Sequence, residues 1–139
     1  MACVGFLFAV NGGNAQKKKP CTNDQAIAAE TEADELKTWQ EVYRSYRKFS
    51  QCDDGTIAEG YSDSIARLLS GHWEQAKELD LLATQDKGFK KFVLVHVDEL
   101  MTSSQAAMIR DNARNHCPSG AQGLCTALSS KVGAGGAKR

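Results

Sequence analysis

The chain has 139 residues, a length typical of a single domain. Its 17 basic and 17 acidic residues cancel, and no clustered basic face favours nucleic acid as a partner. Hydrophobic residues make up 42% and charged residues 24%, as in an ordinary soluble globular protein. Prolines are rare and helix-forming residues are plentiful, so we expect an all-α fold, a single compact bundle of about five helices stapled by disulfides.

The N-terminal segment differs from the rest of the chain. A short apolar run, Ala2–Val10, precedes Asn11–Gln16, an order typical of a secretory signal cleaved after Ala15 or Gln16. The run is far shorter than the roughly 20 apolar residues that span a bilayer, so we expect no membrane span in the mature chain. No basic residue precedes the run, which leaves two alternatives, a start further upstream or a strand at Met1–Val10. We expect residues 1–16 to be a signal peptide and the protein to be periplasmic or secreted.

Four cysteines follow the expected signal, and an even number in a small exported domain favours two disulfides. An unbroken helix over residues 24–49 would place Cys21 about 40 Å from Cys52, far more than a disulfide spans. We therefore expect each of these two cysteines to pair with Cys117 or Cys125. The alternatives are a local Cys117–Cys125 loop with the other two cysteines as free thiols, and four reduced cysteines in a cytosolic protein.

The first expected element is a long helix. Residues 17–23 form a basic lead-in, and Thr22 with Gln25 matches a capping box at the start of the helical domain, residues 24–130. The run from residue 26 to residue 49 contains no Gly or Pro, which favours a helix, although the segment 31–34 allows a bend. Its bulky residues recur every three or four positions and define one inner face. They are Leu36, Trp39, Tyr43, Tyr46 and Phe49.

An acidic turn at residues 53–55 ends this helix. We expect Asp54 to cap a short helical turn that stops at Gly60. Ser62 is then the expected cap of a helix over 63–70, and a further helical piece follows over 72–82. Gly71 separates the two.

The most apolar piece of the mature chain is Phe89–Val97. With Asp86 as its cap, it predicts a helix over 89–100 whose wide apolar face makes it the candidate central helix. Its β-branched residues also allow a strand over 92–97, but no second convincing strand exists to pair with it.

Ser103 or Ser104 is expected to cap a helix that ends near Asn115, and a last short helix runs to Leu128. Residues 131–139 read as a disordered, glycine-rich tail. The residues expected to face the core from the later helices are Ile65, Leu68, Leu69, Ala76, Leu79, Leu82, Phe89, Phe92, Val93, His96, Leu100, Ala107, Met108 and Ala113.

The histidines do not form a recognisable site. His72, His96 and His116 could bind zinc together with a carboxylate, but none is paired at the i, i+4 spacing of helical ligands. His116 and Cys117 are neighbours that project about 100° apart on a helix, which argues against a thiol nucleophile. No phosphate loop or hydrolase motif is present. We expect structural histidines, no metal, no cofactor and no enzymatic activity; the alternative is a metal-binding or hydrolytic protein that uses His72, His96 and nearby carboxylates.

The acidic loop Cys52–Asp63 is the candidate contact surface. It lacks the ligand spacing of a calcium-binding EF-hand, and a turn with a helix cap explains its carboxylates. A cysteine would hold it rigid, and a preorganised loop loses less entropy on binding. We expect Asp53, Asp54, Glu59 and Tyr61 to contact a protein partner, with Tyr61 partly exposed.

The residues from Cys52 to Asp63, the run Phe89–Asp98 and the end marked by Cys117-Pro118 and Cys125 resemble small exported bacterial helical proteins. In size, compartment and helix layout over residues 21–130, the chain is loosely similar to periplasmic immunity proteins that neutralise type VI secretion amidase effectors. No functional motif matches residue by residue. The resemblance implies a protein partner in the cell envelope and an immunity-type inhibitor of a periplasmic enzyme; a structural envelope protein is a further alternative.

Overall fold

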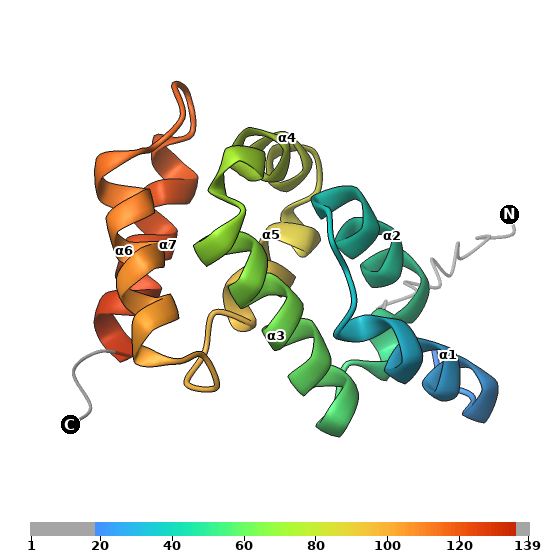
Figure 1. Cartoon of the computed structure of the whole chain (residues 1–139). Helices are drawn as coiled ribbons and strands as arrows, with labels where there is room; N and C mark the ends of the chain where they lie inside the picture. The colour runs from blue at the N-terminus through green and yellow to red at the C-terminus, as the bar shows by residue number, and fades with distance from the viewer. Residues whose placement is uncertain (1–18, 136–139) are drawn as a thin grey trace, which may run out of the picture.

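The computed structural model describes residues 19–135, which contain seven α-helices and no strand (Figure 1). The all-α, disulfide-bonded fold is confirmed, but five helices is too few. The expected signal peptide, residues 1–16, and the end of the expected tail lie outside the described residues. None of the described helices combines the length and the apolar character needed to cross a membrane. The elements are α1 (Asn23–Ala33), α2 (Trp39–Phe49), η1 (Ser50–Cys52), α3 (Gly55–Gly71), η2 (Trp73–Gln75), α4 (Ala76–Gln85), α5 (Lys87–Val95), α6 (Ser103–Asn115) and α7 (Gln122–Gly135).

The helix expected over residues 24–49 is in fact two helices. Thr22 and Gln25 form the predicted capping box at the start of α1, which ends at Ala33. After a short loop, Thr38 caps α2 by accepting a hydrogen bond from the Glu41 N–H. Helices α1 and α2 pack against each other as a hairpin, so the end of α2 returns toward the start of α1.

This hairpin corrects the expected disulfide pairing. Cys21 bonds Cys52, with their Cα atoms 5.0 Å apart, and Cys117 bonds Cys125, with theirs 6.1 Å apart. The prediction of two long-range bridges is therefore wrong, because the expected separation of Cys21 from Cys52 assumed an unbroken helix. The second bridge closes the turn between α6 and α7.

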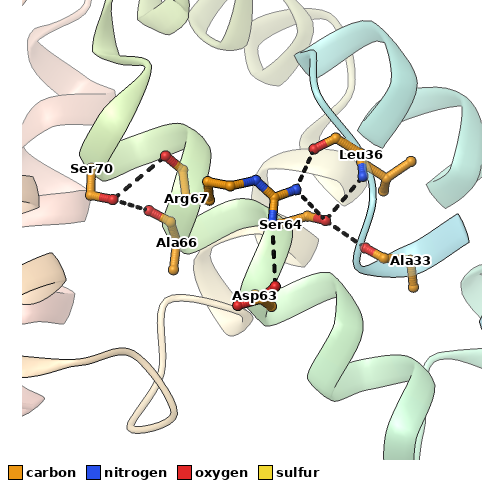
Figure 2. A network of polar contacts seen from close by, with 7 residues as sticks. All are labelled: Ala33, Leu36, Asp63, Ser64, Ala66, Arg67 and Ser70. Atoms are coloured by element: carbon orange, nitrogen blue, oxygen red, sulfur yellow. Dashed lines mark hydrogen bonds and ion pairs between the residues drawn. The ribbon is translucent and has the colours of Figure 1, made fainter.

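Side chains of α3 hold the break between α1 and α2 in place (Figure 2). The buried Ser64 hydroxyl donates to the Ala33 carbonyl at 2.6 Å and accepts from the Leu36 N–H at 3.2 Å. The Arg67 guanidinium donates to the Leu36 carbonyl at 2.8 Å and pairs with Asp63 at 3.3 Å. Backbone groups that the interrupted helix leaves unpaired thus find partners on a distant helix.

Helix α3 is the centre of the bundle, between α1 on one side and α6 on the other (Figure 1). Asp54 caps it, as expected. It runs unbroken through Gly60, so the predicted turn that stops there and the predicted cap at Ser62 are both wrong. Gly60 serves close packing instead: a Cβ atom at this position would lie 2.9 Å from the Ala33 Cβ, which leaves no room for a side chain between α1 and α3.

Helix α5 does not have the central position predicted for residues 89–100. It starts after its cap, Asp86, as expected, but it ends at Val95 and packs against α2, α4 and α7. Leu100, predicted to face the core, lies beyond the helix in a loop and is 59% exposed.

Most of the predicted inner faces are buried, including Trp39, Ile65 and Phe89. Helix α6 is an exception, because it turns Ile109 rather than Met108 toward the core. Helix α7 continues past Leu128 to Gly135, and a buried Val132 extends its packed face.

Candidate functional site

The four residues predicted to contact a partner do not share one surface. Asp54 and Glu59 are exposed, and the Asp54 carboxylate accepts the Gly55 N–H at the start of α3. Asp53 is mostly buried, with 20% of its side chain exposed. The prediction that Tyr61 is partly exposed is wrong: it is fully buried, because the unbroken helix turns it into the core.

Among the core residues, Tyr61 has the side chain whose pKa departs most from its ordinary value. Its hydroxyl lies 2.7 Å from Ser45 Oγ, which itself donates to Glu32 at 3.1 Å, so the phenol donates to Ser45. Burial raises the pKa of Tyr61 to about 12; the hydrogen bond with Ser45 opposes this shift, and the charges of Glu32 and Asp53 add to it. Burial and the neighbouring Asp86 also raise the pKa of Tyr46 above its ordinary value.

We expect Tyr61 to be the last tyrosine to ionise when pH is raised. Its pKa is about 12 in the folded chain against 10.0 ordinarily, so folding favours the neutral phenol. This contribution to stability is complete below pH 10.0 and is lost as pH rises toward 12. The ultraviolet absorbance of tyrosinate measures each step. Tyr61→Phe should remove the last step and Tyr43→Phe should keep it; a last step that survives Tyr61→Phe would contradict the assignment.

His96 joins three segments of the chain through buried hydrogen bonds. It is 3% exposed and forms the C-cap of α5. Its Nε2 lies 2.9 Å from Asp53 Oδ2, and its Nδ1 lies 2.8 Å from Ser62 Oγ. Ser62 Oγ in turn donates to Asp98 Oδ2 at 2.8 Å. We call Asp53, Ser62, His96 and Asp98 the His96 network; it ties the turn before α3, α3 itself, the end of α5 and the loop that follows.

The Ser62 hydroxyl has one proton, and it donates this proton to Asp98. The 2.8 Å contact between Ser62 Oγ and His96 Nδ1 is then a hydrogen bond in which Nδ1–H donates to the serine oxygen. The second oxygen of Asp53, Oδ1, is buried and has no hydrogen-bond partner among residues 19–135.

Sequence reasoning placed Asp53 on a contact surface and Ser62 at a helix cap, and so missed this network. Ser62 and His96 are separated by 34 residues and His96 and Asp53 by 43, so no local spacing reveals them. One signal was available: if α3 is a single helix, Ser62 follows Tyr61 on its buried side and needs a polar partner there.

Ser62, His96 and Asp53 are the residue types of a hydrolase triad, but their arrangement does not activate the hydroxyl. In a triad the imidazole accepts the serine proton. Here that proton goes to Asp98, and the imidazole donates to the serine. Ser62 is 4% exposed in the middle of α3, where backbone N–H groups bond within the helix and cannot stabilise an oxyanion.

The other histidines stay apart from His96. His72 contacts Glu74 and His116 contacts Asp111, both at the exposed surface. Within the described part of the chain, no three His, Cys, Asp or Glu side chains are grouped so that they could hold a metal ion. The histidines thus have separate local partners.

A pocket of about 300 Å³ opens beside the His96 network, between α3 and the start of α6. Ser62 belongs to both the pocket and the network. The Oδ1 of Asp98 accepts the Leu100 N–H at 2.9 Å while its Oδ2 accepts from Ser62, so one carboxylate fixes the loop that forms a wall of the pocket. The lining residues are Glu59, Ser62, Asp63, Ala66, Leu100, Met101 and Gln105.

Comparisons of the chain with protein-family models, with curated proteins and with solved structures return no match. The resemblance to immunity proteins therefore stays an expectation, and a functional proposal depends on the residues of this chain alone.

Proposed function

We propose that the chain is an exported helical domain that binds a protein partner through the pocket between α3 and α6, without catalysis. The observation that carries this proposal is Leu100, a 59% exposed leucine at the pocket, in a loop that the Asp98 carboxylate connects to α3 by hydrogen bonds to the Leu100 N–H and to Ser62. We call Glu59, Asp63, Leu100 and Met101 the docking corner.

The loop of Leu100 is preorganised. An isolated exposed leucine is ordinary on a protein surface. This one follows Asp98, whose two carboxylate oxygens are both engaged, one by the Leu100 N–H and one by Ser62. Ser62 is in turn bonded to the buried His96. A surface that is already ordered loses less conformational entropy on binding, so more of the contact energy appears as affinity.

The chemistry of the docking corner selects one kind of occupant. Leu100 and Met101 offer apolar contact, while Glu59 adds a negative charge beside Asp63, which pairs with Arg67. A partner surface that combines apolar and basic side chains complements both features. Of the four residues predicted from sequence to contact a partner, Glu59 belongs to the docking corner. Asp53 does not, but it contacts His96 in the network beside the pocket.

The two disulfides support an oxidising compartment for this function, such as the bacterial periplasm or the cell exterior. We therefore propose that the partner is a protein of the cell envelope. In its narrowest form, the function is that of an immunity-type inhibitor whose docking corner covers part of a periplasmic enzyme.

Replacing Leu100 should weaken partner capture more than replacing another exposed leucine. Leu81, on α4, is 56% exposed and serves as the matched control. Immobilised wild-type, Leu100→Ser and Leu81→Ser proteins are incubated with envelope extract of the source cells, and retained proteins are quantified by mass spectrometry. We expect a specific protein that wild type and Leu81→Ser retain alike, and that Leu100→Ser retains about tenfold less, as for a hot-spot side chain.

Circular dichroism should show the same helix content in all three proteins, because both leucines are exposed. Equal retention by Leu100→Ser and wild type would remove the docking corner from the proposal. Retention of structural envelope components alone, unaffected by either substitution, would favour the structural envelope protein instead.

A further inference from the structure

We infer that the pocket of the docking corner receives one lysine or arginine side chain of the partner protein. The inference depends on the proposed protein-binding function and specifies which chemical group enters the pocket. It is carried by the charges, the apolar wall and the size of the pocket together.

The acidic side of the pocket has one carboxylate available for a ligand. Asp63 already pairs with Arg67 at 3.3 Å. The Glu59 side chain makes no hydrogen bond or ion pair with any other residue of the described chain, and no Lys or Arg is among the lining residues. The two other polar side chains of the lining are engaged: Ser62 Oγ bonds His96 and Asp98, and Gln105 Oε1 accepts the Thr102 N–H at 3.0 Å. Glu59 is therefore the acceptor left free for a cation.

The pocket also has an apolar lining, from Ala66 on α3 and from Leu100 and Met101 in the loop before α6. Lysine and arginine combine a long aliphatic stem with a charged tip, so the stem can cover apolar surface while the tip stays at a polar group. Such a side chain would place its stem against Leu100 and Met101 and its cation at Glu59. An anionic group would meet Glu59 and Asp63 instead, and like charges repel.

The size of the pocket agrees with a single side chain. Its volume of about 300 Å³ is at the lower limit of pockets that hold small molecules and cofactors. The rim residue Leu100 is exposed, so the pocket is reached from solvent without movement of the core.

The test uses capped tripeptides as probes, with alanine on both sides of a central arginine, lysine, citrulline or norleucine. Citrulline keeps the length of arginine and norleucine keeps the four-carbon stem of lysine, both without the charge. Binding is followed by backbone amide chemical shifts of the full-length protein. We expect the arginine and lysine peptides to shift the amides of Leu100, Met101 and Gln105, and the neutral peptides to shift them much less. High salt should weaken the binding, since the site is open to solvent.

Glu59→Gln should lower the affinity for the arginine peptide about two- to fivefold, the range expected for one solvent-accessible ion pair. Glu35→Gln is the matched control, because Glu35 is an exposed carboxylate outside the pocket. Equal shifts with arginine and citrulline, or no loss in Glu59→Gln, would overturn the inference. So would shifts of the same amides with protein concentration alone, which would identify a second copy of the chain as the occupant.

The two proposals fail separately. If no peptide binds but Leu100→Ser still loses a partner, only the basic side chain is wrong. If Leu100→Ser also retains everything that wild type retains, the proposed function fails with it.

Discussion

Replacing both Cys21 and Cys52 with alanine should lower the free energy of unfolding by about 3.7 kcal/mol. The same replacement of Cys117 and Cys125 should lower it by only about 2.5 kcal/mol. The two bridges differ in sequence separation, 31 residues against 8. The longer loop loses more chain entropy in the unfolded state when it is closed, so its removal costs more.

Urea unfolding of the two double variants and the wild type measures this difference, with circular dichroism as the signal. The Cys21 pair has a second role, because Cys52 directly precedes Asp53 of the His96 network. Its loss should therefore also broaden or shift the amide signal of Leu100, while loss of the Cys117 pair should leave it in place. A larger stability loss for the Cys117 pair would contradict the loop-length argument.

Local signals in the sequence predicted most of the helical content. Thr22 with Gln25, Asp54 and Asp86 each mark a true helix start, because a capping side chain bonds backbone groups within three residues of itself. The core faces of α3 and α5 follow from the period of their apolar residues. These features depend on residues that are close together along the chain, so a single sequence is enough to predict them.

The break between α1 and α2 has only a weak local signal: the segment 31–34 allows a bend, and Thr38 caps α2 through the Glu41 N–H. Residues 34–38 contain no Gly or Pro, and the groups that hold the break, Ser64 and Arg67, lie about 30 residues further along, at separations of 28 and 31 from Leu36. The wrong disulfide pairing followed directly from this omission, because it assumed a continuous helix between Cys21 and Cys52.

In the candidate site too, features set by local sequence were predicted and features set by tertiary packing were not. Glu59 was expected to be exposed and is exposed, whereas Tyr61 was misplaced because Gly60 was interpreted as a helix end. Gly60 instead allows close contact between α1 and α3, a role that depends on Ala33. Ser62 and His96 come together only when α3 and α5 are packed, so their hydrogen bond is a property of the tertiary structure.

Ser64→Ala should destabilise the fold by about 2–4 kcal/mol. The substitution leaves the Ala33 carbonyl and the Leu36 N–H buried without the hydroxyl that now serves both. Each buried backbone group without a partner costs about 1–3 kcal/mol, and the two lie at the same break in the chain. Urea unfolding gives the loss in free energy, and hydrogen exchange at Leu36 reports whether the break has opened.

Ser70→Ala is the matched control on the same helix (Figure 2). Ser70 Oγ donates to the Ala66 carbonyl at 2.7 Å, a bond within α3 that adds to a carbonyl already in the helical ladder. Its loss should change stability by less than about 1 kcal/mol. If Ser64→Ala were as mild as Ser70→Ala, residues 34–38 would hold the hairpin without help from α3. If it is several times more costly, the fold of the N-terminal half depends on a serine that belongs to a different helix, and the sequence of that half alone does not reveal this dependence.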